Sequence, residues 1–233
     1  MNNDDDKDID PRRRTIVLSA LAAGLFAGPA TIGNVFAARG SIHRLAGQVK
    51  VNGVSATRAT VISAGDLVET GTDGNIVFTV AKDAFILRRN SRLQLTPAEE
   101  DNSIVEGLRM FTGALLSVFG SRRHRINTAV ATIGIRGTGV YVEVEPEQDY
   151  ICTCYGVTDV AANDDPQSSE TVDAGHHTPR YVLRDAPAGK RIREAPFKNH
   201  TDAELTLIES LVERVPEFSG NYDGYERPRR RNY

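Results

Sequence analysis

Residues 140–145 have the sequence Val-Tyr-Val-Glu-Val-Glu, in which every second residue is a valine. A period of two residues is typical of a β-strand with one buried face, because successive side chains point to opposite sides of the strand. Outward from this stretch, short apolar runs recur at residues 49–51, 76–80, 85–87, 93–95, 108–111 and 150–155. These runs predict an all-β fold.

Turn-forming residues separate the runs. The pair Asn52-Gly53 follows the first of them, and Asn-Gly is the strongest short-range signal for a two-residue hairpin turn. Further turn clusters stand at residues 72–75, 90–91 and 112–113. Many short strands with this glycine-rich punctuation predict a sandwich, a barrel or a solenoid.

A single helix is predicted near the C-terminus. Residues 201–204, Thr-Asp-Ala-Glu, form a capping box, in which the first and last side chains bind orphan backbone donors at the helix start. Apolar residues then follow at helical spacing, and they are Leu205, Ile208, Leu211, Val212 and Val215. We expect Glu209 on the opposite, polar side and the helix to end at Pro216. Its apolar side should pack onto the sheet.

The first 37 residues have the three parts of an export signal. Arg13 and Arg14 are followed, after one residue, by two apolar ones, a pattern that resembles the twin-arginine signal. Residues 15–38 carry no charge, and small residues at Val35 and Ala37 precede a cleavage site after Ala37. The alternative is a retained membrane anchor, since about 20 apolar residues span a bilayer. Either form places the rest of the chain in the periplasm.

The composition argues against several classes of function. The net charge is −3, so no global basic field exists to attract nucleic acid or anionic lipid. Tryptophan is absent and aromatic residues make up 6% of the chain, which disfavours platforms that stack bases or sugars. The sequence has no nucleophile elbow, phosphate loop, dinucleotide fingerprint or His-Glu-x-x-His motif. We therefore predict a protein that is not an enzyme and does not bind nucleic acid.

Cys152 and Cys154 are the main candidates for chemistry. One residue apart on a strand, their thiols point to the same face and can share a soft metal ion. Possible further ligands are His200 and either His176 or His177, of which alternation lets only one face the thiols. Such a Cys₂His₂ set suits zinc, while ferrous iron or a two-iron cluster is also conceivable. A disulfide, or two ordinary buried thiols, are the alternatives.

Two stretches carry a family resemblance. Residues 64–71, Ala-Gly-Asp-Leu-Val-Glu-Thr-Gly, resemble the Gly-Asp…Thr-Gly signature of the FecR-domain family, and residues 133–138 resemble its Ile-Arg-Gly-Thr signature. The resemblance runs from about Gly40 to about Leu183. The signature positions are Gly65, Asp66, Thr70, Gly71, Arg136, Gly137 and Thr138. Glycine and aspartate serve turns, so we interpret these residues as fold markers.

The resemblance implies a β-rich extracytoplasmic module, of solenoid or sandwich type, that recognises another envelope protein or relays a signal. Family members couple an outer-membrane receptor to a cytoplasmic sigma factor. Here only about fourteen polar residues precede the apolar run, so an anti-sigma role is not expected.

The expected parts are an export signal (1–37), a FecR-like β domain (38–185), a linker and helix (186–218) and a disordered tail (219–233). Contact with the membrane is expected only through an uncleaved N-terminal segment. The oligomeric state is left open.

Overall fold

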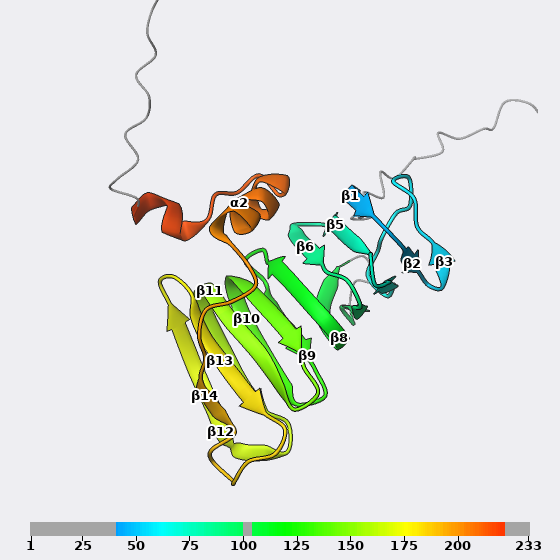
Figure 1. The fold of residues 1–233 in the computed structure, drawn as a ribbon. Helices are drawn as coiled ribbons and strands as arrows, with labels where there is room; N and C mark the ends of the chain where they lie inside the picture. Colours follow the sequence, from blue (N-terminus) through cyan, green and yellow to red (C-terminus); the bar gives the residue numbers. More distant parts are fainter. Residues whose placement is uncertain (1–40, 100–103, 222–233) are drawn as a thin grey trace, which may run out of the picture. The chain divides into compact units, whose positions relative to one another are not determined.

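The computed structural model describes residues 41–99 and 104–221, all of which lie in one unit of the chain, Ala37–Tyr233. Within them the fold is a fourteen-stranded sheet with one α-helix and one 3-10 helix (Figure 1). The all-β fold with a short C-terminal helix is confirmed. The elements are β1 Ser41–Ala46, β2 Val49–Val51, β3 Val54–Ser55, β4 Leu67–Thr70, β5 Asn75–Val80, β6 Asp83–Leu87, β7 Arg92–Pro97, β8 Val105–Val118, β9 Arg123–Asn127, β10 Ala131–Val144, β11 Gln148–Ala162, β12 Asp165–Ala174, β13 Thr178–Leu183, β14 Ile192–Glu194, α2 Asp202–Leu211 and η1 Glu217–Asn221.

Strand pairing is mostly local and antiparallel. The main path through the sheet runs β14-β13-β11-β10-β9-β8-β7-β4-β2-β3, with β1, β5, β6 and β12 attached at its sides. Among the described strands, only β8 and β9 pair in parallel. The predicted hairpin joins β2 to β3, where Asn52 and Gly53 both have positive φ, at 52° and 79°. Two consecutive positive φ values are what a type I′ turn requires.

Three long strands, β8, β10 and β11, each contain a glycine with positive φ and change their pairing partner there. The glycines are Gly113, Gly137 and Gly156, with φ of 84°, 58° and 79°. From Gly113 onward β8 pairs with β10 rather than β7. On either side of Gly137, β10 pairs with β9 and then β8. β11 pairs with β13 before Gly156 and with β12 from it onward. Glycine adopts positive φ at no steric cost, which lets one strand serve two partners.

Two of these glycines lie inside strands, at positions where the sequence predicts turns. The sequence predicts a turn at residues 112–113, but β8 continues through them to Val118. Gly137 likewise lies inside β10, where the register with β11 shifts between Arg136 and Gly139. This shift is a β-bulge, and a bulge uses the same positive-φ glycine as a turn. The local sequence alone therefore does not distinguish a β-bulge from a turn.

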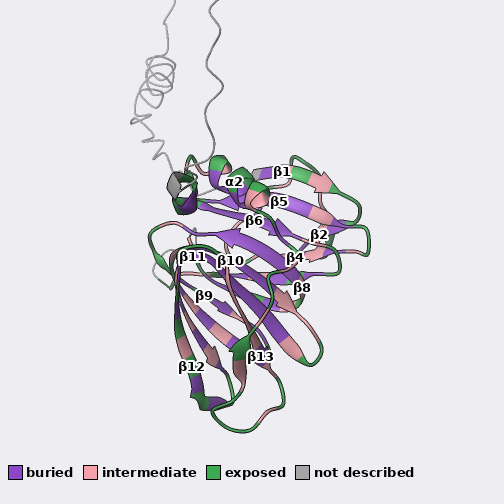
Figure 2. Ribbon diagram, turned by 60° about the vertical axis from the view of Figure 1, so that its left-hand side comes forward, coloured by how far each residue is buried: buried purple, intermediate pink, exposed green. Residues whose placement is uncertain are grey.

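Apolar side chains form two clusters, on opposite faces of the strands. In β11, Ile151 belongs to the larger cluster, whereas its neighbours Tyr150 and Cys152 belong to the smaller one. The smaller cluster also contains Leu205 and Ile208 of α2, so the helix covers this face (Figure 2). Alternate side chains of a strand point to opposite faces, which explains the division.

The helix begins as predicted but ends early. Thr201 is its N-cap, and the capping box with Glu204 is present. The helix ends at Leu211 with Val212 as C-cap, so Val215, which is 74% exposed, is not part of it. Glu209 corrects the expectation of a polar face, because it is buried. Its carboxylate accepts hydrogen bonds from the hydroxyl of Tyr155 and from Nε of Arg214.

Some predicted boundaries shift and others lie outside the described residues. The sheet extends past residue 185, because β14 pairs with β13. The export-signal residues Arg13, Arg14 and Ala37 lie outside the described part of the chain, as does the tail from residue 222. Within residues 41–99 and 104–221, no helix is both long and apolar enough to cross a membrane.

Candidate metal centre

Three separate segments bring two thiols and two imidazoles together. Cys152 and Cys154 lie on β11, on the face that α2 covers, and both are 0% exposed. His177 comes from the turn between β12 and β13, where its φ is 45°. His200 is buried in the segment that leads into α2. The fold thus brings Cys152 and His200, which are 48 residues apart in the sequence, into one site.

The ligand atoms face one another at short range. Sγ of Cys152 lies 3.7 Å from Nδ1 of His177, and Sγ of Cys154 lies 3.4 Å from Nε2 of His200. The two imidazole nitrogens are 3.3 Å apart. One potential ligand atom from each of the four residues lies within 4.8 Å of all the others.

These separations match a single tetrahedral ion. With Zn–S about 2.3 Å and Zn–N about 2.0–2.1 Å, tetrahedral angles place sulfur and nitrogen roughly 3.5 Å apart and two nitrogens roughly 3.3 Å apart. A two-iron cluster fits poorly, because its cysteines and histidines bind different irons. Each Cys–His pair would then be separated by the width of the cluster, which 3.4 and 3.7 Å do not allow.

Outer hydrogen bonds orient both imidazoles toward the thiols. Nδ1 of His200 donates to the carbonyl oxygen of Lys198 at 2.9 Å, and Nε2 of His177 donates to Oδ1 of Asp202 at 2.8 Å. Carbonyl and carboxylate oxygens can only accept, so the hydrogen of each neutral ring sits on its outward nitrogen. The inward nitrogens, which are 3.3 Å apart, then carry lone pairs. Such outer partners typically hold metal-binding histidines in place.

The surroundings shift the pKa values of the two thiols in opposite directions. The hydrogen bond from Cys154, with further ones from His177 and His200, outweighs burial and lowers the pKa of Cys152 to about 4. Burial raises the pKa of Cys154 well above its ordinary value. For His177, burial opposes the charged ring, but hydrogen bonds to Cys152 and Asp202 prevail and raise its pKa. Without a metal, the inward Nδ1 of His177 therefore shares a proton with the Cys152 thiolate, and a soft cation would displace this proton when it binds.

His176 is the predicted ligand that does not reach the thiols. It is exposed, and its Nε2 donates to Oδ1 of Asp202 at 2.9 Å. Only one of the adjacent histidines faces the cysteines, although both lie in a turn rather than on a strand. The sequence reasoning missed the roles of Asp202 and Lys198. From sequence, Asp202 is predicted only as part of the helix start, yet its position two residues after His200 is a usable signal.

Neither cysteine forms a disulfide. Both are free and buried. Residues i and i+2 of an extended strand are near the upper limit of Cα separation for a disulfide, so the strand geometry disfavours that alternative. The interpretation that both are ordinary buried thiols does not explain why the imidazoles of His177 and His200 are oriented toward them.

The signature residues lie away from this centre and have structural contacts. Asp66 accepts hydrogen bonds from Nδ2 of Asn52 and from the backbone of Ser63, both at 2.7 Å. Arg136 pairs with Asp159 at 2.5 Å. The remaining positions are a positive-φ glycine at 65, the bulge glycine at 137, the buried threonine at 138 and the pair 70–71, which contacts the turn after β6.

Comparisons with known proteins show only distant likeness. No family model matches the chain, and no curated protein matches it. Two crystal structures of a "putative anti-sigma factor" from Parabacteroides distasonis ATCC 8503 resemble it in part. One aligns over 62% of this chain at 14% identity with a TM-score of 0.43, the other over 70% at 15% identity with a TM-score of 0.41. Each alignment covers 64% of the other chain, which is less than two thirds of its length.

Proposed function

We propose that this chain is a non-catalytic binding module of the bacterial envelope that holds one zinc ion with Cys152, Cys154, His177 and His200. The observation that carries the proposal is the spacing of the four ligand atoms, at 3.3–3.7 Å for the close pairs. A soft-ligand S₂N₂ set in tetrahedral arrangement is typical of zinc. Ferrous iron is the second ion that this set accommodates.

The four protein ligands indicate a structural ion rather than a catalytic one. A catalytic zinc keeps one position open for water or substrate, whereas four protein ligands close the coordination sphere. The ion would tie β11 to the β12–β13 turn and to the segment before α2. Because the site is assembled only in the folded chain, binding energy would add to the stability of the fold.

Two further features of the sequence support an envelope role. The ordered signature motifs resemble the FecR-domain family, whose modules recognise other envelope proteins. Arg13 and Arg14 resemble the export signal of a path that carries folded, cofactor-loaded proteins. We propose that zinc is bound in the reducing cytoplasm, before export to the periplasm. The partner of the module would be another envelope protein.

Metal analysis of natively exported protein tests the zinc site. We expect close to one equivalent of zinc per chain, measured by plasma mass spectrometry after gel filtration. The double variant Cys152→Ser with Cys154→Ser should lose this metal and unfold at a lower temperature. Thr153→Ser is the matched control, because it lies between the cysteines and bonds Thr158 instead. A metal-free wild-type protein, or a double variant that keeps its zinc, would overturn the proposal.

A further inference from the structure

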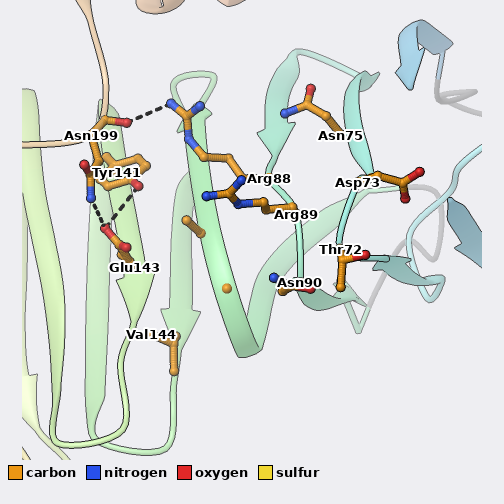
Figure 3. A pocket seen from close by; sticks show the side chains of 13 residues that line it. Thr72, Asp73, Asn75, Arg88, Arg89, Asn90, Tyr141, Glu143, Val144 and Asn199 are labelled. Carbon is orange, nitrogen blue, oxygen red and sulfur yellow. Dashed lines mark hydrogen bonds between the residues drawn. The ribbon is translucent and has the colours of Figure 1, made fainter. Parts of the chain in front are cut away.

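A polar cavity of about 660 Å³ lies beside the metal centre. One wall comes from the loop of residues 72–75 and the turn of residues 88–90, and the other from β10 and Asn199. Figure 3 shows the side chains of Arg88 and Arg89 extending from the turn toward the wall that carries Tyr141 and Glu143. Two adjacent guanidinium groups thus project into one concave space.

The turn that presents the two arginines is held by several hydrogen bonds. The backbone carbonyls of residues 88, 89 and 90 accept hydrogen bonds from the hydroxyls of Thr70, Ser91 and Thr112, at 2.5, 3.3 and 3.1 Å. The backbone N–H of Asn90 donates to Gly71 at 3.0 Å. These contacts hold the backbone of the turn, which is the kind of support that a binding site needs from its surroundings.

The signature residues supply part of this support. Thr70 and Gly71 bind the turn directly, as described above. Ser91 also accepts a hydrogen bond from the backbone of Ala114 at 2.9 Å. This contact needs glycine at 113, because any Cβ there would overlap Ser91. Residues interpreted from sequence as fold markers therefore converge on the arginine-bearing turn.

Arg88 is largely engaged by the protein, whereas Arg89 is free to bind a ligand. Nη2 of Arg88 donates to the carbonyl oxygen of Asn199 and to Oε1 of Glu204, both at 2.9 Å. Its Nε has no hydrogen-bond partner among the described residues, but it is buried and so does not face the cavity. Arg89 is exposed and forms no ion pair within residues 41–99 and 104–221.

The acidic side chains of the cavity are already engaged. Oδ1 of Asp73 accepts from the backbone of Gln48 at 3.1 Å. Oε2 of Glu143 accepts from the hydroxyl of Tyr141 at 3.2 Å and from Nδ2 of Asn199 at 2.8 Å. Glu143 also lies 3.8 Å from the ammonium of Lys198. Asp73 has no ion pair among the described residues, but its carboxylate points away from the two arginines (Figure 3), so the unpaired charge nearest to Arg88 is that of Arg89.

We infer that this cavity binds a carboxylate group of a peptide segment, with Arg89 as its main partner and Arg88 as the second. Guanidinium groups bind carboxylates through paired, charge-assisted hydrogen bonds. Asn75 and Asn90 on the same wall add amide donors. The inference extends the proposed recognition of an envelope protein and does not depend on zinc, so its failure would leave the metal measurement unaffected.

Titration of the full chain with short peptides tests the cavity. The probes are N-acetyl-Ala-Ala-Ala with a free C-terminal carboxylate, the same peptide as an amide, and amidated N-acetyl-Ala-Asp-Ala. Backbone amide shifts of ¹⁵N-labelled protein, at Thr72, Asn75 and Asn199, report binding. We expect one or both charged peptides to shift these signals and the neutral amide not to. The two charged probes distinguish a chain end from an acidic side chain.

Arg89→Gln should weaken binding of the charged peptide about tenfold, because one charge-assisted hydrogen bond is lost. Arg125→Gln is the control, since Arg125 is also exposed but lies on β9 in another cavity. The inference is wrong if neither charged peptide shifts the cavity signals. Equal binding of the neutral amide, or unchanged affinity in Arg89→Gln, would overturn it as well.

Discussion

The imidazole of His200 stacks on the ring of Tyr141, with centroids 4.5 Å apart and planes inclined by 19°. His200 faces the thiols through Nε2, while Tyr141 lines the neighbouring cavity. One pair of rings therefore forms the partition between the two proposed sites. Stacking of this kind restricts the orientation of the imidazole.

Removing the aromatic partner should weaken metal binding. We expect Tyr141→Leu to lower zinc affinity at least severalfold, because His200 loses the surface that fixes its plane, and outer contacts typically change affinity 10–100-fold. Tyr141→Phe keeps the ring and loses only the hydroxyl that bonds Glu143, so it should bind zinc like the wild type. Competition with a chromogenic chelator measures both. Equal affinities in the two variants would contradict a role for the stacking.

Buried Asp149 should make stability depend on pH. Its carboxylate is 0% exposed, accepts a hydrogen bond from Thr128, and has one oxygen without a partner among the described residues. Burial raises its pKa to about 6. Since the folded pKa exceeds the unfolded one, its stabilising contribution is complete below about pH 4 and is lost as pH rises through 6.

Asp149→Asn should therefore be more stable than the wild type above pH 6, by roughly 2 kcal/mol, with the difference shrinking toward pH 4. Urea unfolding at pH 4.5, 6 and 8 measures this difference. Asp159→Asn is a control of opposite sign, because hydrogen bonds from Thr171 and Arg136 lower the pKa of half-buried Asp159. A difference for Asp149→Asn that does not change with pH would contradict the prediction.

The bulge at Gly137 should not tolerate a β-branched residue. Its φ of 58° disfavours side chains, although a Cβ there would meet nothing closer than 4.0 Å. Gly137→Val should therefore destabilise the fold by more than about 1 kcal/mol through backbone strain alone. Gly137→Asn should cost less, because asparagine tolerates the left-handed region. Similar unfolding midpoints in urea for the two variants would exclude strain as the cause.

Export should depend on the arginine pair. Changing Arg13 and Arg14 to lysine should leave the precursor in the cytoplasm, because the twin-arginine path reads the paired guanidinium groups. Arg12→Lys is the control, since it leaves the pair intact. Fractionation with immunoblotting measures the distribution, and mass spectrometry of the exported chain should find Ala38 at its N-terminus. An undiminished periplasmic yield would indicate the general secretory route.

Local patterns predicted the features that depend on near neighbours. The turn at Asn52-Gly53, the capping box and the common face of the two cysteines all follow from a few adjacent residues. Sequence did not predict that Glu209 is buried, because its partner Tyr155 is 54 residues away. For the same reason, the sequence did not predict the contact of Asp202 with His177, because these residues are 25 positions apart. Such contacts depend on how the C-terminal segment returns to β11.

The spread of the four ligands along the chain links the proposed zinc ion to the order in which the chain is synthesised. The cysteines lie on β11, yet the last ligand, His200, comes only after β14 and just before α2. A nascent chain that stops short of this residue has three ligands and would hold the ion weakly. A tightly bound zinc ion would thus indicate that the chain has been synthesised as far as His200 and that this segment has folded against β11. If the chain follows the proposed route for folded proteins, zinc would be held fully only in chains that have folded as far as His200.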